Sequence, residues 1–245
     1  IGSAPNDVWP LSGKYFDGAA GVHSLRTVLD QFKLADELGF DWLAVAEHHY
    51  SPFSLCPNPM LMAAAVSQVT SRAKIAVLGP TIPILNPVRV AEELAMVDLL
   101  SGGRLIAGLM RGTANEYVTY NHNPGESRER FSESLKLIQR CWSENEPFGW
   151  VGRYYDYRTI SIWPRPVQRP SPPIYISASS PESGEFAAEN QLGVGFAFST
   201  IPHASKAAQH YRDHAGKMGW VPTPDKIIYR ALFHLADTDE EAFAG

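Results

Sequence analysis

Hydrophobic positions along the chain alternate between a helical spacing and short continuous runs. After Ser24, apolar residues recur every three or four positions as far as Leu38, which predicts an amphipathic helix. The Ser24 hydroxyl can cap the start of this helix, and Gly39 is suited to end it. Residues 42–46 follow at once and are all apolar. A strand without a polar face has to be covered on both sides, as parallel strands in α/β folds are.

The same alternation continues through the rest of the chain. Further helices are predicted over residues 59–69, 87–100, 127–142, 181–189 and about 203–217, and further strands over 75–78, 105–109, 174–176, 194–198 and 227–234. No change of composition marks a linker, so residues 1–245 are predicted to form one α/β domain. The segment over residues 147–172 is rich in Pro and Tyr and is too long for an ordinary connection between a helix and a strand. It predicts either a lid or an inserted hairpin.

Two architectures fit six strands that alternate with helices: an open doubly wound sheet and a closed (β/α)₈ TIM barrel. The first strand is not followed by a Gly-rich dinucleotide-binding motif, whereas polar residues follow several strands. In a barrel these strand ends form a ring around one site, so the barrel is favoured. The chain starts at Ile1 and stops within an acid-rich helix start. We therefore expect a truncated barrel that lacks its first strand and its closing strand and helix.

Composition narrows the classes of protein that remain. Hydrophobic residues make up 44% and charged residues 19%, which argues against disorder. The net charge is -5 with no run of like charges, so no basic face for nucleic acid is expected. Cys56 and Cys141 are the only cysteines, which is typical of a reducing compartment. The longest apolar stretch, residues 60–66, is far shorter than a membrane span. We expect a soluble, cytoplasmic protein that does not act at a membrane.

The first visible strand ends in Glu47, His48 and His49. Because strand side chains alternate, Glu47 and His49 are expected on one side and His48 on the other. A metal site would need further ligands, for which His122 and His234 are the plausible candidates. The histidines could also be polar residues that simply close the strand. A histidine acting on a substrate near neutral pH is the interpretation we favour, with no metal.

Two further segments could bind an anion. Arg111 follows the strand over residues 105–109 and could hold a phosphate or carboxylate, or simply pair with Glu116. Ser179, Ser180 and Ser183 surround the start of a helix, where free amides and hydroxyls favour an anion. Helix capping would occupy only one of these hydroxyls. Together the two segments suggest a cofactor that carries a phosphate.

Several spaced motifs resemble the bacterial luciferase-like flavin monooxygenases. They are residues 46–51, residues 86–93 with 99–104 after them, Arg111 with Gly112, and the prolines that lead into residues 172–176. The resemblance covers residues 22–235 and implies a (β/α)₈ barrel. Residue by residue, it places the catalytic histidine on His48 and its neighbour on His49. It also implies that Arg111 and the turn with Ser179, Ser180 and Ser183 hold the flavin phosphate, and that Gly79 lies beside the isoalloxazine ring.

The family resemblance also implies a reaction. Reduced FMN, supplied by a separate flavin reductase in a two-component system, would react with O₂ to oxygenate a small, apolar organic substrate. A homodimer or heterodimer is implied as well. Three alternatives stay open: a deazaflavin-dependent hydride-transfer oxidoreductase, a non-catalytic flavin-binding barrel, and a metal-dependent hydrolase. The substrate pocket could be lined by aromatic residues, namely Trp9, Tyr15, Phe16, Phe53, Tyr117, Tyr120, Trp150, Tyr154 and Tyr155.

Overall fold

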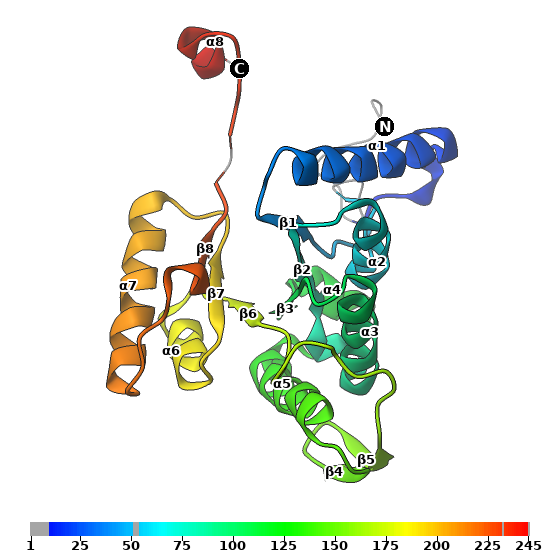
Figure 1. Ribbon diagram of the computed structural model, residues 1–245, viewed down its shortest axis with the longest axis vertical. Helices are drawn as coiled ribbons and strands as arrows, with labels where there is room; N and C mark the ends of the chain where they lie inside the picture. The colour runs from blue at the N-terminus through cyan, green and yellow to red at the C-terminus, as the bar shows by residue number, and fades with distance from the viewer. Residues whose placement is uncertain (1–9, 51–53, 232, 245) are drawn as a thin grey trace. The chain divides into compact units, whose positions relative to one another are not determined.

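The computed structural model describes residues 10–50, 54–231 and 233–244 (Figure 1). Trp9, Ser51 and Phe53, which belong to the predicted motif and aromatic set, lie outside the described residues. The chain divides into two compact units, Ile1–Ile174 and Tyr175–Gly245. We call them the first and the second unit and describe each by itself.

The first unit contains three parallel strands with helices between them. Its elements are η1 (Gly13–Tyr15), α1 (Gly18–Glu37), β1 (Trp42–Val45), α2 (Pro59–Val69), β2 (Lys74–Thr81), η2 (Ile82–Ile84), α3 (Pro87–Leu100), β3 (Leu105–Met110), α4 (Ala114–Thr119), η3 (Pro124–Glu126), α5 (Ser127–Ser143), β4 (Phe148–Val151) and β5 (Asp156–Ile160). Strands β1, β2 and β3 pair in that order, and Val45 lies opposite Val77 while Leu78 lies opposite Gly108. The carboxyl ends of all three strands therefore lie at one edge of the sheet.

Helices α2 and α3 have the predicted bounds, but α1 begins earlier than predicted. Its cap is Asp17, whose Oδ1 accepts hydrogen bonds from the amides of Ala19 and Ala20 at 2.8 and 3.2 Å. Ser24 lies inside the helix, so the predicted cap is wrong. Residues 18–23 carry two glycines and little apolar periodicity, which explains why the sequence pattern misses this first turn.

Burial also corrects one expectation about the strands. Strands β2 and β3 are buried almost throughout, with Ile75, Val77 and Leu105 fully enclosed. In β1, Leu43 and Val45 are buried but Ala44 is exposed. Within the first unit, therefore, one face of this strand is left uncovered, contrary to the prediction that both faces are covered.

The long segment after α5 is an inserted hairpin, which decides between the two predicted alternatives. Strands β4 and β5 pair antiparallel and lie at one end of α5 (Figure 1). The carboxylate of Glu133 on α5 accepts hydrogen bonds from Trp150 Nε1 and from the amides of Arg153, Tyr154 and Tyr155, at 3.0–3.2 Å. Trp150, Tyr154 and Tyr155 thus belong to a hairpin that is fixed to a helix.

Glu133→Ala is expected to loosen this hairpin without unfolding the sheet. The change leaves the three amides without their acceptor, and bonds to a charged acceptor contribute about 1.5–3 kcal/mol each. Trypsin cleavage after Arg153 should accelerate at least about tenfold, because local opening governs proteolysis. Lys136→Gln, on the exposed face of α5, is the control and should leave that rate unchanged. Equal cleavage of the Glu133→Ala and wild-type chains would contradict the anchoring role.

The second unit repeats the alternation of parallel strands and helices. Its elements are β6 (Ile174–Ser177), α6 (Pro181–Glu189), β7 (Gly193–Phe196), α7 (Ile201–Lys217), η4 (Pro224–Lys226), β8 (Ile227–Tyr229) and α8 (Asp239–Ala244). Strands β6, β7 and β8 pair in that order. Helix α6 has the predicted bounds, whereas β8 ends at Tyr229, five residues before the predicted strand does. Among the described residues of both units, no helix combines the length and the apolar character needed to cross a membrane.

Two histidine–glutamate contacts hold α6 against α7. His210 Nε2 lies 3.0 Å from Glu185 Oε1, and His214 Nε2 lies 3.4 Å from Glu189 Oε1. Beneath them, the buried Tyr211 donates a 2.6 Å hydrogen bond from its hydroxyl to the carbonyl of Leu192. These contacts fix the helix whose first turn carries the serines singled out in the sequence.

Candidate functional site

Two of the predicted motifs meet the last residue of β2 at the carboxyl edge of the first unit's sheet. Glu47 follows β1, Thr81 ends β2, and Gly112 follows β3. Thr81 is paired with Met110 in the strand register. Gly112 has φ +80° and lies so close to Thr81 that a Cβ would overlap the threonine methyl group. Glycine is required there because no larger residue fits against Thr81 with that backbone conformation.

Glu47 and His49 form a buried pair at this edge. His49 Nε2 lies 3.1 Å from Glu47 Oε1, and the two side chains are only 8% and 4% exposed. The predicted placement of these two residues on one side is therefore confirmed. Burial raises the pKa of Glu47, and the contacts of its carboxylate with His49 and with the hydroxyl and amide of Thr81 act in the opposite direction.

Two tyrosines enclose the other side of the His49 ring. The Tyr50 ring centroid lies 5.2 Å away, and the Tyr120 ring meets His49 edge-on at 5.9 Å. Tyr50 has φ +61°, an uncommon conformation for a large residue. The amide of His48, the residue before His49, donates a 3.1 Å hydrogen bond to the carbonyl of Cys56. Sequence analysis did not single out Thr81 or Tyr50, although Tyr50 follows the two histidines directly and Thr81 closes the next strand.

Gly79 lies in β2, inside the sheet near its carboxyl end. A Cβ on Gly79 would overlap the carbonyl oxygens of Gly108 and Val77. The residue thus allows the backbones of β2 and β3 to approach closely just before Thr81. A site that depends on the position of Thr81 consequently depends on this glycine.

Gly79→Ala is expected to destabilise the chain by about 3 kcal/mol or more, since the neighbouring backbone cannot move aside like a flexible side chain. Urea unfolding followed by circular dichroism would measure the change. Gly18→Ala is the matched control, because a Cβ there meets no atom within 4 Å. The interpretation fails if the two variants unfold at the same urea concentration.

Arg111 is exposed and makes no ion pair among the described residues. The alternative that Arg111 pairs with Glu116 is wrong, because the Glu116 carboxylate instead caps α4. Its Oε2 accepts a 2.7 Å hydrogen bond from the amide of Thr113 and a short one from the Thr113 hydroxyl. The hydroxyl of Tyr117 donates to the carbonyl of Arg111 at 2.5 Å, which fixes the backbone below the guanidinium. Burial raises the pKa of Tyr117 to about 12.

The serine turn lies in the second unit, after β6. The Ser180 hydroxyl caps α6 by accepting from the amide of Ser183 at 3.4 Å, and the two hydroxyls are 3.1 Å apart. Ser177 and Ser179 form a second hydroxyl pair at 3.4 Å. Of the three predicted serines, Ser180 alone caps the helix, and the Ser183 hydroxyl pairs with it. The third, Ser179, lines a cavity of about 360 Å³ together with Phe196, Ala197, Phe198, Ser199, Thr200 and His203.

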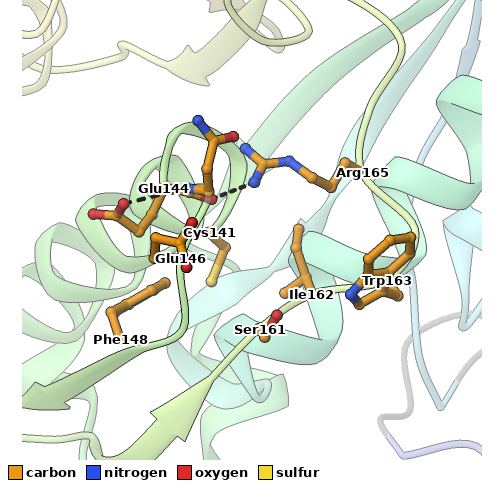
Figure 2. A pocket seen from close by; sticks show the side chains of 9 residues that line it. Cys141, Glu144, Glu146, Phe148, Ser161, Ile162, Trp163 and Arg165 are labelled. Atoms are coloured by element: carbon orange, nitrogen blue, oxygen red, sulfur yellow. Dashed lines mark hydrogen bonds between the residues drawn. The ribbon is translucent and has the colours of Figure 1, made fainter.

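A second, smaller cavity of about 40 Å³ lies beside the end of α5 in the first unit (Figure 2). Cys141, Phe148 and Trp163 contribute to its lining. Arg165 closes the helix end by donating from Nη2 to the carbonyl of Trp142 at 2.6 Å and from Nη1 to the carbonyl of Glu144. A space of this size holds at most one or two water molecules. Its lining residues are part of the packing that supports the hairpin.

The side chains that would form a metal site do not lie together among the described residues. Among the described residues, no three histidine, cysteine or carboxylate side chains are grouped so that they could bind a metal ion. His49 is paired with Glu47, and His122 follows α4. The chemistry that the first unit's edge can offer is hydrogen bonding and proton transfer.

Comparison with known proteins assigns the chain to a family. Residues 5–244 match the model of the luciferase-like monooxygenases, so the chain belongs to this family. It is 26% identical to the oxygenase component of the flavin-dependent trigonelline monooxygenase of Acinetobacter baylyi, over 88% of this chain and 60% of that protein. It is 33% identical to the F420-dependent glucose-6-phosphate dehydrogenase of Amycolatopsis mediterranei, over 77% of this chain and 56% of that protein.

A solved structure supports the same assignment. The monooxygenase RslO1 from Streptomyces bottropensis matches with a TM-score of 0.83 and 31% identity, over 89% of this chain and 67% of that one. The predicted fold class, an α/β chain with the luciferase-like (β/α)₈-barrel architecture, is confirmed. The chain spans about half to three fifths of the length of the curated relatives it matches.

Proposed function

We propose that this chain carries residues of the active site of a flavin-dependent monooxygenase that uses reduced FMN and O₂ to oxygenate a small, apolar organic substrate. The observation that carries the proposal is the meeting of two predicted motifs at Thr81, on one strand edge of the first unit. Glu47, paired with His49, is hydrogen-bonded to Thr81, which in turn lies against Gly112 beside Arg111. Active sites of barrel enzymes lie at the carboxyl ends of the strands, and this is such an edge.

The residues present fit a cofactor with a phosphate group. Arg111 is an exposed cation without an ion pair among the described residues, so its guanidinium is available to an anion. Independently, the Ser179 hydroxyl lines the cavity of the second unit, next to the first turn of α6. We assign Arg111, Ser179, Ser180 and Ser183 to the flavin phosphate, and Gly79 to the backbone beside the flavin ring.

Bound reduced flavin would supply the electrons that activate O₂. The protein has to move a proton and exclude water, and His48 is the residue we assign to proton transfer because an imidazole gives and takes a proton near neutral pH. We assign the neighbouring His49 a supporting role in the buried pair with Glu47. A separate flavin reductase would deliver the reduced cofactor, and we propose a dimer as the working assembly.

A second candidate function is hydride transfer with a deazaflavin cofactor. It is favoured by the similarity to the F420-dependent glucose-6-phosphate dehydrogenase, which is at a higher identity than the similarity to the trigonelline monooxygenase. The same anion-binding residues would serve either cofactor, since both carry phosphate. Only the monooxygenase consumes O₂, so oxygen uptake distinguishes the two functions.

Oxygen uptake with each reduced cofactor tests the proposal. The chain would be mixed with FMN and a flavin reductase, and oxygen consumption and oxygenated product would be measured across small aldehydes, ketones and terpenoids. Product formation that depends on both FMN and substrate supports the monooxygenase. Hydrogen peroxide without oxygenated product in every case, together with turnover on reduced deazaflavin, would overturn it.

A further inference from the structure

The carboxylate of Glu47 is the most enclosed acidic group at the carboxyl edge of the first unit. Its side chain is 4% exposed, and it is held from two directions. His49, two residues further along the same segment, places its Nε2 3.1 Å from Oε1 of Glu47. Thr81 approaches from the end of β2 with its hydroxyl and its amide. The carboxylate therefore ties the segment after β1 to the last residue of β2.

Other polar and titratable groups around this pair come from three further segments. Burial raises the pKa of the Cys56 thiol, and the nearby Glu47 charge raises it further. Tyr50 contacts His49 from the following residue, and Tyr120 contacts it from the end of α4. The Glu116 carboxylate acts on Tyr50 from the first turn of α4. Among these groups, none carries a positive charge that would balance Glu47 other than His49 when it is protonated.

His48 lies between the two members of the buried pair. Its neighbours on both sides have their side chains fixed, and its own amide is bonded to the carbonyl of Cys56 at 3.1 Å. Anchoring the side chains of residues 47 and 49 restrains the backbone of the residue between them. A shift of about 1 Å at a reacting group is enough to slow catalysis by about a hundredfold.

We propose that Glu47 is a positioning residue: its carboxylate, clamped by Thr81 and His49, fixes the backbone from which His48 acts. This inference rests on the proposed function of His48 and names the element that supports it. Because its carboxylate is enclosed between Thr81 and His49, Glu47 acts through the histidine and not on the substrate.

The energetics favour a functional role over a stabilising one. Burial raises the pKa of Glu47 above its usual range, despite the three contacts that oppose the shift. A carboxyl group whose pKa is higher in the folded than in the unfolded chain favours folding below the unfolded pKa, and this advantage is lost as pH rises through the folded pKa. Ionising Glu47 in the folded chain therefore costs stability. Retaining such a cost is typical of groups kept for activity.

Glu47→Gln separates the two roles because it keeps the shape and removes the charge. We expect kcat to fall at least about tenfold, while KM and the FMN dissociation constant stay within about twofold. We also expect the melting temperature of Glu47→Gln, relative to that of wild type, to increase between pH 5 and pH 8.

Thr81→Val removes one contact of the clamp and should also lower kcat, by a smaller factor. Asp36→Asn is the control: this buried carboxylate accepts from the amides of Ser71 and Ala73 before β2 and should affect stability without lowering kcat.

Hydrogen exchange of the His48 amide is a readout that needs no flavin. In wild type this amide should be protected by its bond to Cys56, and in Glu47→Gln its exchange should accelerate at least about fivefold. If wild type binds no flavin and shows no turnover, the proposed function fails, while the exchange rates still decide whether Glu47 positions His48. Unchanged exchange in Glu47→Gln, or a kcat within twofold of an active wild type, would overturn the inference.

Discussion

His48→Ala is expected to lower turnover at least about a hundredfold while FMN affinity stays within about threefold. Proton transfer by a positioned side chain contributes about 10² to 10⁴ in rate, and alanine removes the group without touching the residues assigned to the phosphate. A threefold change in affinity corresponds to less than about 1 kcal/mol. Steady-state oxygen uptake and flavin fluorescence quenching would measure the two quantities on the same preparation.

His49→Ala is the matched control for this experiment. The change removes the partner at 3.1 Å from a carboxylate that is almost fully buried, so it should cost about 1–3 kcal/mol of stability. Its loss of turnover should be smaller than that of His48→Ala, because His49 supports the strand end and does not act on substrate. Folded His48→Ala with near-native turnover would move the catalytic role to another residue.

Arg111→Ala is expected to weaken FMN binding about 10- to 150-fold and to leave riboflavin binding nearly unchanged. A charge-assisted hydrogen bond to phosphate contributes about 1.5–3 kcal/mol, and riboflavin has no phosphate with which to make it. The guanidinium is exposed and takes part in no ion pair among the described residues, so its loss should leave no buried charge behind. Titration of each flavin by fluorescence quenching provides the comparison.

Two further variants sharpen the test of the phosphate site. Ser179→Ala removes the one predicted serine hydroxyl that is not part of the α6 cap, and it should lower the preference for FMN by a smaller factor. Arg89→Ala is the control, because Arg89 is an exposed cation on α3 that pairs with Glu93 at 2.8 Å. Equal affinity of wild type for FMN and riboflavin would rule out Arg111 and the serine turn as a phosphate site.

The elements that the sequence predicted best are those with a complete local signal. Helices α2, α3 and α6 each begin with a capping residue followed by proline, and each matched its predicted bounds. The first turn of α1 and the short helix α4 were missed. In α4 six residues are held by a capping box between Thr113 and Glu116, which is too short to show a helical period.

The sequence also placed part of the candidate site. Strand alternation put Glu47 and His49 on one side, and the structure confirms this. The sequence left open whether Arg111 pairs with Glu116 or is available to hold a phosphate or carboxylate. Tertiary structure decided it, since the backbone at Thr113 brings two donors to the Glu116 carboxylate.

By itself, then, the sequence determined the alternation of parallel strands and helices, the family resemblance, and the residue types that stand at the strand ends. These features are encoded locally, in hydrophobic period, caps and short motifs. Only the tertiary structure decided that residues 148–160, within the segment 147–172, form a hairpin held by Glu133, and that Thr81 meets Glu47. Both depend on contacts between residues far apart in the chain, which no local pattern specifies. The first arises when a helix packs against the hairpin, and the second when parallel strands pair in a particular register.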